Sequence, residues 1–404
     1  MCISAPFSRA PQPVACPLLE AGAVMFFAPF PLLFTWLIGL LSLAVVGGGL
    51  YLLWAWYFGI VVGTGYLLLG LLMTLWSIAG RWIVLLFHPA GPDEPHTLEP
   101  DASVLLKRPD GTTLYVEKYG PPDAPAIILT HGAGANRTSW YYVIRRLSER
   151  FQLIVWDMPG LGHSRKPRDG DYSLERHARD LEAVIGVAGG RPAVLVGHSM
   201  GGMVLLTFCR LFREDLARRI HGIVLVDTSH TNPVCTTTAS GLMRALQKPV
   251  LEPLLHLTAW LAPAVWLMSW LGYFNGSSHL VGMVAGFAGT QTRGQLDLAV
   301  RYNPLAWPGV QARETLAMFG YDATEVLGSI TVPALVFTGH LDRLIVPQTG
   351  RFMVDRLLNG VLVQLKPAGH MAVFERNQRL VELLSAFAEK VVPHGGSEHG
   401  SSRD

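Results

Sequence analysis

The chain has 404 residues, of which 50% are hydrophobic and 15% charged, with a formal net charge of +2. Soluble domains carry about 25% charged residues, so this chain is unusually apolar. The near-neutral charge, and the lack of any run of Lys and Arg with interleaved aromatic residues, argue against a nucleic-acid-binding protein. The length allows one large domain with an appendage, or two domains.

The first distinctive segment is residues 21–80, which contain no Asp, Glu, Lys, Arg or His. One membrane span needs about 20 apolar residues and a signal-peptide core roughly 7–15, so the segment is too long for either. We predict two spans, near 31–54 and 60–80, joined at the aromatic segment 54–59. A third span would need very tight turns at glycines, and the alternative to a membrane hairpin is a helical hairpin buried in a soluble core.

The segments on either side of the spans have a different composition. Residues 1–24 are proline-rich and lack periodicity, which predicts a disordered leader, and Met25 is a candidate initiator. Residues 88–101 are rich in proline and acidic residues and predict an extended linker. A soluble domain is expected to begin at about Ala102.

From that point short apolar runs alternate with helical patterns, which is typical of a mostly parallel sheet with helices on both faces. The first two runs flank Pro109-Asp110-Gly111, a turn sequence that predicts a β-hairpin. The predicted strands are 103–108, 113–120, 126–130, 152–157, 193–197, 222–227, 334–339 and 361–365. Helical patterns lie between them, for example at 173–188 and 200–213.

The alternation is interrupted after Asp227, where no strand is evident before residue 334. Within this interval Pro253–Thr292 carries no Asp, Glu, Lys or Arg. An insertion at the carboxyl end of a strand lies over the sheet edge where ligands bind in open α/β folds. We therefore predict a helical cap, whose apolar residues form an acyl pocket, dip into a bilayer or pack on the core.

The chain is thus predicted to comprise a disordered leader (1–24), a transmembrane hairpin of two helices (25–87), a linker (88–101), an α/β core (102–228 and 331–392), a helical cap (229–330) and a disordered tail (393–404).

Three residues suited to nucleophilic catalysis each follow a predicted strand: Ser199, Asp342 and His370. Ester cleavage by serine requires a base, a group that orients the base, and donors for the oxyanion. Ser199 lies in "GHSMGG", where Gly197 and Gly201 suit a strained strand-to-helix turn that exposes the hydroxyl. We predict Ser199 as nucleophile, His370 as general base and Asp342 as the acid that orients it.

Some of these assignments have rivals. Asp227 ends the preceding strand and could reach the imidazole instead of Asp342. His131 and His198 flank the predicted site but are expected to pack loops. Neither His/Asp clusters nor the four cysteines (Cys2, Cys16, Cys209 and Cys235) have metal-ligand spacing, and no cofactor is expected.

Five segments, in the expected order, resemble motifs of the α/β-hydrolase superfamily, and the resemblance extends over residues 102–390. They are "HGAGANRTSW" (131–140), "DMPGLGHSRKP" (157–167), "GHSMGG" (197–202), "GHLDRLIVP" (339–347) and "AGHMAVFERN" (368–377). The resemblance implies that the backbone N–H groups of Ala133 and Met200 form the oxyanion hole. Epoxide hydrolases and haloalkane dehalogenases of this fold carry aspartate at the turn, so Ser199 argues against both.

The expected function is that of a membrane-anchored serine hydrolase of lipophilic esters. The arrangement is similar to that of membrane-anchored monoacylglycerol lipases of the same superfamily. One alternative is a C–C bond hydrolase acting on dienoic diketones, which has the same catalytic set and a similar "SMGG" turn. The other is a non-catalytic binding protein anchored in the membrane.

Charge near the spans predicts which side of the membrane the domain faces. Arg9 precedes the spans, whereas Arg81, Lys107 and Arg108 follow them, and the connecting turn is uncharged. Because Lys and Arg favour the cytoplasm, we predict that both ends of the hairpin and the hydrolase domain are cytoplasmic. The lack of a disulfide pattern is compatible with this. The competing topology is a single signal-anchor span with the domain outside.

Overall fold

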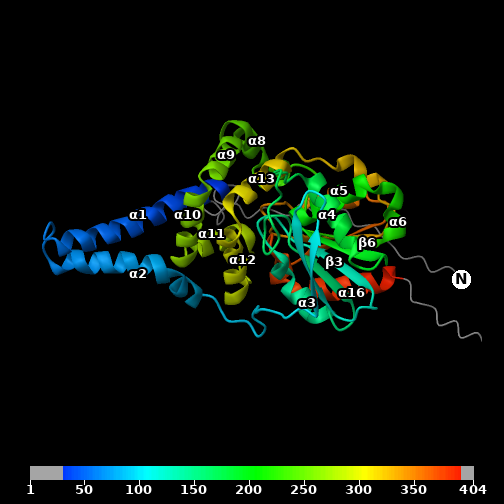
Figure 1. Cartoon of the computed structure of the whole chain (residues 1–404), viewed down its shortest axis with the longest axis horizontal. Helices are drawn as coiled ribbons and strands as arrows, with labels where there is room; N and C mark the ends of the chain where they lie inside the picture. The colour runs from blue at the N-terminus through cyan, green and yellow to red at the C-terminus, as the bar shows by residue number, and fades with distance from the viewer. Residues whose placement is uncertain (1–30, 393–404) are drawn as a thin grey trace, which may run out of the picture.

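The computed structural model describes residues 31–392, so the predicted leader, Met25 and the predicted tail lie outside the described residues. Two long helices project from one side of an α/β body (Figure 1). A group of shorter helices lies between this projection and the sheet. The catalytic candidates all belong to the α/β body, and its sheet determines where they meet.

The central sheet has eight strands in the order β1-β2-β4-β3-β5-β6-β7-β8. The first two pairings of this order, β1 with β2 and β2 with β4, are antiparallel, and all the others are parallel, so the predicted mostly parallel sheet is confirmed. The strands are β1 (Ala102–Lys107), β2 (Thr113–Tyr119), β3 (Ala126–Thr130), β4 (Gln152–Trp156), β5 (Ala193–His198), β6 (Ile220–Val226), β7 (Ala334–Gly339) and β8 (Gly360–Leu365).

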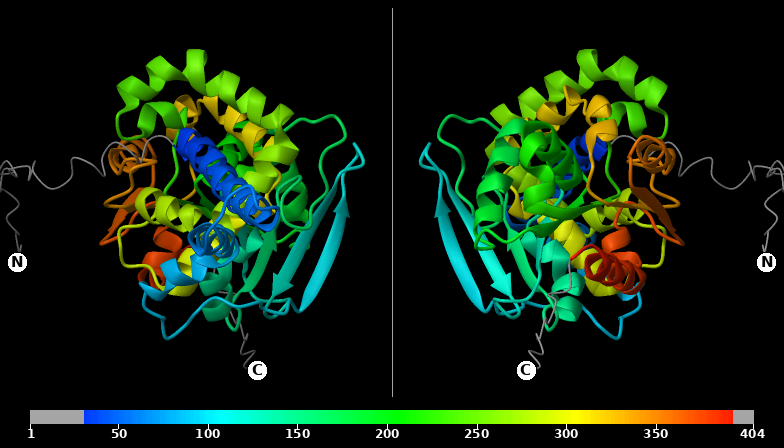
Figure 2. Two further views of the ribbon diagram at one scale, coloured as in Figure 1. Left: turned by 90° about the vertical axis from the view of Figure 1, so that its left-hand side faces the viewer. Right: turned by 90° about the vertical axis from the view of Figure 1, so that its right-hand side faces the viewer.

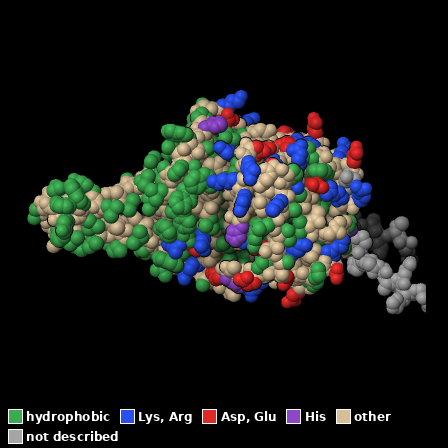
Figure 3. Space-filling view, viewed as in Figure 1, with side chains coloured by type: hydrophobic (Ala, Val, Ile, Leu, Met, Phe, Trp, Pro, Cys, Tyr) green, Lys and Arg blue, Asp and Glu red, His purple; other side chains and the backbone are tan. Residues whose placement is uncertain are grey.

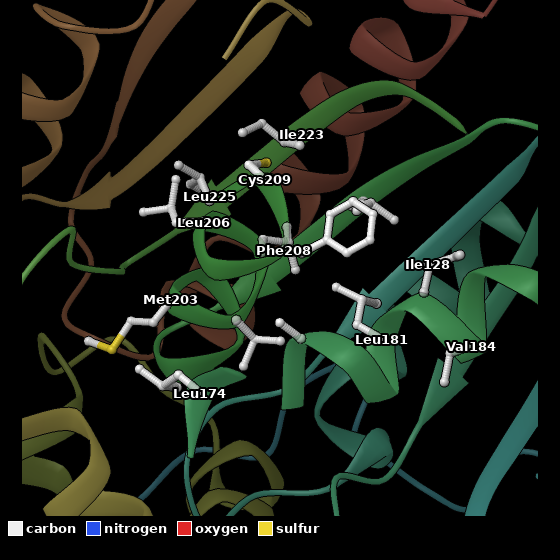
Figure 4. Packing of buried hydrophobic residues seen from close by; sticks show 14 of the residues in the cluster. Ile128, Leu174, Leu181, Val184, Met203, Leu206, Phe208, Cys209, Ile223 and Leu225 are labelled. Atoms are coloured by element: carbon white, nitrogen blue, oxygen red, sulfur yellow. The ribbon is translucent and has the colours of Figure 1, made fainter. Parts of the chain in front are cut away.

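Both faces of the sheet are covered by helices, as the two side views in Figure 2 show. Because side chains alternate along a strand, neighbouring residues of β3 enter different cores. Ile128 packs with Leu181 of helix α4 (Leu174–Gly186) and Phe208 of helix α5 (Met200–Leu211) (Figure 4). Ile127 packs on the other face, in the cluster that includes residues of α3 (Tyr141–Leu147) and α16 (Asn377–Val391). Burial on both faces explains why the central strands are continuous apolar runs.

The helices of the body are α3 (Tyr141–Leu147), α4 (Leu174–Gly186), α5 (Met200–Leu211), α6 (Leu216–Arg219), α14 (Gln348–Val354), α15 (Ala372–Glu375) and α16 (Asn377–Val391), with short 3-10 turns at η2 (Arg137–Trp140), η3 (Arg213–Asp215) and η5 (Thr324–Ser329).

Between β6 and β7 the chain is helical, and the described residues of this interval contain no strand beyond one isolated bridge, Thr231 to Asp322. The helices of this cap are α7 (Pro233–Thr236), α8 (Ser240–Leu246), α9 (Glu252–Trp260), α10 (Ala262–Phe274), α11 (Ser277–Gly286), α12 (Arg293–Leu305) and α13 (Pro308–Phe319), with a π-helical turn η4 (Gln247–Leu251) before α9.

The two projecting helices, α1 (Pro31–Tyr57) and α2 (Thr64–Leu86), are each long and apolar enough to cross a membrane. Their boundaries differ from the predicted 31–54 and 60–80. The helix continues through the aromatic residues that follow position 54, so α1 ends at Tyr57. The turn forms after it, where Gly59 and Gly63 adopt positive φ (71° and 121°). Glycines 47–49 stay helical, and α2 continues beyond Arg81.

Candidate active site

Ser199 lies at the sharp junction between β5 and α5, with φ 52° and ψ −122°. Its neighbours must be small because the backbone passes close to other chain segments. A Cβ added to Gly197 would lie 2.5 Å from the Gly201 carbonyl, and one added to Gly201 would lie 2.3 Å from the Thr130 oxygen. The two glycines therefore permit the strained turn, and the turn presents the Ser199 side chain to the cavity that it lines.

The structure brings the three predicted catalytic side chains together in a chain of hydrogen bonds. The Nε2 atom of His370 is 3.0 Å from the Ser199 hydroxyl oxygen, and its Nδ1 atom is 2.8 Å from the Asp342 carboxylate. The other oxygen of Asp342 accepts hydrogen bonds from two backbone N–H groups, those of Leu344 and Ile345, at 2.9 Å each. The carboxylate is thus fixed by its own loop as it orients the imidazole.

The surroundings of His370 favour its protonated form. Burial by itself disfavours the imidazolium, but the charge of Asp342 and its hydrogen bond outweigh burial and raise the pKa of His370. An imidazole that is stabilised when protonated can act as a general base toward a neighbouring hydroxyl group, here that of Ser199.

Asp227, the rival acid, lies close by but has another role in the fold. Its Oδ1 atom accepts the Gly339 N–H at 2.7 Å, which ties the end of β6 to the end of β7. Complete burial, followed by the charge of Asp342, raises the pKa of Asp227 well above its usual range. In this arrangement Asp227 bonds to the backbone at the end of β7, and the hydrogen bond to the His370 ring belongs to Asp342.

The predicted oxyanion donors, Ala133 and Met200, lie on the loop after β3 and at the start of α5. Within residues 31–392 neither backbone N–H is engaged in a hydrogen bond. The two backbones come close because residue 132 is glycine: a Cβ there would lie 3.1 Å from the Ser199 Cβ. Both N–H groups are thus free to meet a negative oxygen beside Ser199.

Two further histidines hold these loops. His131 donates from Nδ1 to the Gly132 carbonyl at 2.8 Å and accepts the Met158 N–H at Nε2. His198 donates to the His370 carbonyl at 3.0 Å, and complete burial, followed by the charge of His370, lowers the pKa of His198 to about 3. Both ring nitrogens of His131 and the Nε2 atom of His198 thus bond to backbone groups, as expected of packing residues.

Sequence reasoning missed a buried acid beside the oxyanion loop. Glu314 of α13 is fully buried, and its Oε2 atom accepts the Gly134 N–H at 3.3 Å. Burial raises the pKa of Glu314 to about 8, although the Gly134 hydrogen bond opposes this. At neutral pH the group is mostly protonated, so it links the cap to the loop without placing a negative charge beside the oxyanion donors. A lone acid in a helical pattern carried no sequence signal for this role.

A cavity of about 440 Å³ opens at Ser199 and His370. Its walls are mainly apolar cap residues, including Leu255 of α9 and Val265 of α10. They also include Leu32, Thr35 and Trp36 of α1, which the sequence analysis treated only as part of a membrane span. Across residues 31–392 no group of three or more His, Cys, Asp or Glu side chains could hold a metal ion.

Comparison with known proteins identifies similar chains. The model of a family described as "Alpha/beta hydrolase family" matches residues 127–383. The hydrolase YugF of Bacillus subtilis is 25% identical over 280 residues, which cover 69% of this chain and 95% of YugF.

Solved structures share the fold. An esterase from Exiguobacterium antarcticum superposes with a TM-score of 0.59 at 21% identity, covering 71% of this chain and 100% of the esterase. A membrane phospholipase A superposes with a TM-score of 0.55 at 20% identity, covering 72% of this chain and 86% of that protein.

Proposed function

This chain belongs to the α/β-hydrolase family, and from that premise we propose that it is a membrane-anchored serine hydrolase that cleaves lipophilic carboxylic esters. The observation that carries the proposal is the hydrogen-bonded series Ser199, His370 and Asp342 at a mainly apolar cavity. Serine at the turn supports an acyl-enzyme route, because its oxygen can form an ester with the substrate's acyl group.

In the first half of the reaction the Ser199 oxygen attacks the ester carbonyl carbon as its proton passes to His370 Nε2. The carbonyl oxygen becomes negative and accepts hydrogen bonds from the N–H groups of Ala133 and Met200. The bond between the carbonyl carbon and the alcohol oxygen then breaks, and His370 gives its proton to the departing alcohol. Ser199 is left acylated.

In the second half water replaces the alcohol. His370 takes a proton from the water as its oxygen attacks the acyl carbon, and the tetrahedral intermediate again places a negative oxygen between the two backbone donors. When the bond to Ser199 breaks, the proton returns to the serine oxygen and the carboxylic acid leaves. The Asp342 carboxylate accepts the hydrogen bond from Nδ1 and stabilises the imidazolium in both halves.

The apolar cavity gives the proposal a measurable preference for acyl length. Each buried methylene contributes about 0.8 kcal/mol, so two more carbons in the cavity should raise kcat/KM roughly tenfold until the cavity ends. The measurement is a p-nitrophenyl ester series from acetate upward, with fluorophosphonate labelling to count active enzyme. A profile that peaks at acetate would contradict a lipophilic substrate, and a chain that neither labels nor hydrolyses any ester would contradict the enzyme itself.

The same proposal includes the anchor and its orientation. Two apolar helices long enough to cross a membrane support a hairpin with both ends on one side, and the basic residues near it lie outside the turn. We expect alkaline phosphatase fused after residue 101 to be inactive in a bacterial host, because the fusion stays in the cytoplasm. High phosphatase activity would mean that the domain is exported, and a fusion at the turn, after Gly59, supplies the exported control.

A further inference from the structure

One wall of the catalytic cavity comes from the helix hairpin. Leu32, Thr35 and Trp36, in the first turns of α1, line the same cavity as Ser199 and His370. The indole N–H of Trp36 donates to the Thr258 hydroxyl of α9 at 2.9 Å, and Thr258 lines the cavity as well. The end of α1 nearest the α/β body therefore lines the cavity at Ser199, although α1 is also long and apolar enough to cross a membrane.

This wall is fixed by close packing between the hairpin and the cap. The Asn275 side chain, at the end of α10, donates to the Ser42 hydroxyl at 2.7 Å, and both residues are buried. A Cβ added to Gly39 would lie 2.8 Å from the Met268 Cβ, so α1 and α10 touch through a glycine. Arg293 of α12 donates to the Leu85 carbonyl of α2 at 2.9 Å. Both hairpin helices are thus seated on the cap.

The length of α1 indicates how deep this wall lies in a bilayer. At about 1.5 Å per residue, the helix from Tyr57 back to Ile38 spans about 29 Å, close to the roughly 30 Å of hydrocarbon in a membrane. Trp36 and Leu32 then lie about 3 Å and 9 Å beyond the hydrocarbon edge, in the layer of lipid head groups. The ester bonds of membrane lipids lie in that layer.

The outer surface of the cap supports the same depth. Apolar side chains cover the hairpin and continue onto the neighbouring cap helices (Figure 3). Trp260 of α9 and Trp266 of α10 are exposed, and exposed tryptophans are typical of a membrane–water interface. The Arg81 guanidinium stacks on Tyr273 and Phe274 at 4.7 and 5.6 Å, an arrangement that lets a basic residue lie at the edge of the hydrocarbon.

We propose that the first turns of α1 form part of the acyl-binding site, and that a single-chain lipid ester inserts its acyl chain from the bilayer between α1 and the cap helices α9 and α10. The proposal rests on the proposed function and names its substrate class. A cavity of about 440 Å³ is at the smaller end of ligand pockets, which argues for one acyl chain.

The test uses the full chain in phosphatidylcholine vesicles and compares kcat/KM for 1-oleoylglycerol with that for p-nitrophenyl acetate. Leu32→Trp fills the part of the cavity next to α1 and should lower the ratio of kcat/KM for the oleoyl ester to that for the acetyl ester at least about tenfold. Leu32→Ala enlarges the cavity and should move the end of the acyl-length profile outward by about two carbons. Leu72→Trp, at an exposed position of α2, is the matched control and should leave both measurements unchanged.

The outcomes separate the two proposals. If Leu32→Trp and Leu32→Ala both match Leu72→Trp, α1 is not part of the acyl site. If Leu32→Trp fails to label with fluorophosphonate, its tryptophan blocks the probe or the variant has not folded, and Leu32→Ala then decides. The wild-type rate on 1-oleoylglycerol should follow its mole fraction in the bilayer, and a rate set by bulk concentration would overturn the route from the membrane. Failure of the wild type to label or to hydrolyse either ester would refute the proposed function.

Discussion

Replacing Ser199 with alanine is expected to abolish fluorophosphonate labelling and to lower kcat for p-nitrophenyl esters about a millionfold. The reason is that the variant has no oxygen to attack the carbonyl carbon, while His370 and the oxyanion donors remain in place. The Ser199 hydroxyl is 3.0 Å from His370 Nε2, so its removal deletes the reacting atom without a large change in packing. Labelling, steady-state kinetics and thermal unfolding should be measured together.

Ser329→Ala, in the short turn before β7, is the matched control and should retain wild-type labelling and turnover. The serine there donates a hydrogen bond to the local Val326 carbonyl. If Ser199→Ala is still labelled at the wild-type rate, another residue is the nucleophile. If labelling is lost only together with a large fall in the unfolding temperature, Ser199→Cys, which restores a nucleophile of similar size, should recover covalent modification by a thiol-reactive ester analogue.

Replacing Asp342 with asparagine is expected to lower kcat about ten-thousandfold. The carboxylate accepts from His370 Nδ1 at 2.8 Å, which keeps the lone pair of Nε2 directed at Ser199. An asparagine amide that donates to Nδ1 would hold the imidazole in the opposite tautomer, with Nε2 protonated and unable to accept the serine proton. The measurement is kcat on a p-nitrophenyl ester of fixed chain length.

Asp227→Asn is the matched comparison, because this carboxyl group lies close to the site but bonds to the Gly339 N–H, whereas Asp342 bonds to the His370 ring. The amide oxygen can still accept the Gly339 N–H, so we expect kcat to fall tenfold or less. Most single substitutions change the free energy of unfolding by about 1 kcal/mol, so the variant should also stay folded. If Asp227→Asn abolishes activity while Asp342→Asn stays near wild type, the roles of the two acids must be exchanged.

The pH profile gives a second readout of Asp342. His370 must be neutral to accept the serine proton, so activity falls as the pH drops through its pKa. Asp342 raises that pKa against the effect of burial. Without the carboxylate, burial remains and the pKa falls, so the acidic limb of the residual activity of Asp342→Asn should move to lower pH. An acidic limb at the same pH as in the wild type would mean that Asp342 does not influence the pKa of His370.

Much of the fold and of the catalytic set follows from local sequence pattern. Continuous apolar runs such as 126–130 predict strands buried on both faces, because a strand with one face in water alternates apolar with polar residues. The carboxyl ends of parallel strands meet at one edge of a sheet, so Ser199, Asp342 and His370, each placed after a strand, were expected to converge. The same reasoning favoured Asp342 as the orienting acid but left Asp227 as a rival, because each of the two residues follows a predicted strand.

The tertiary structure decided what depends on packing between segments far apart in the chain. The fold directs Asp227 to the Gly339 N–H and Asp342 to the His370 ring, and neither contact is visible in the local sequence. Glu314 reaches the oxyanion loop only because α13 folds back over it. The apolar residues of α1 specified a helix of membrane length, since length and hydropathy are local properties. That Leu32 and Trp36 also line the cavity at Ser199 depends on the docking of α1 on the cap, and a pattern of hydrophobic residues carries no record of which surface each one contacts.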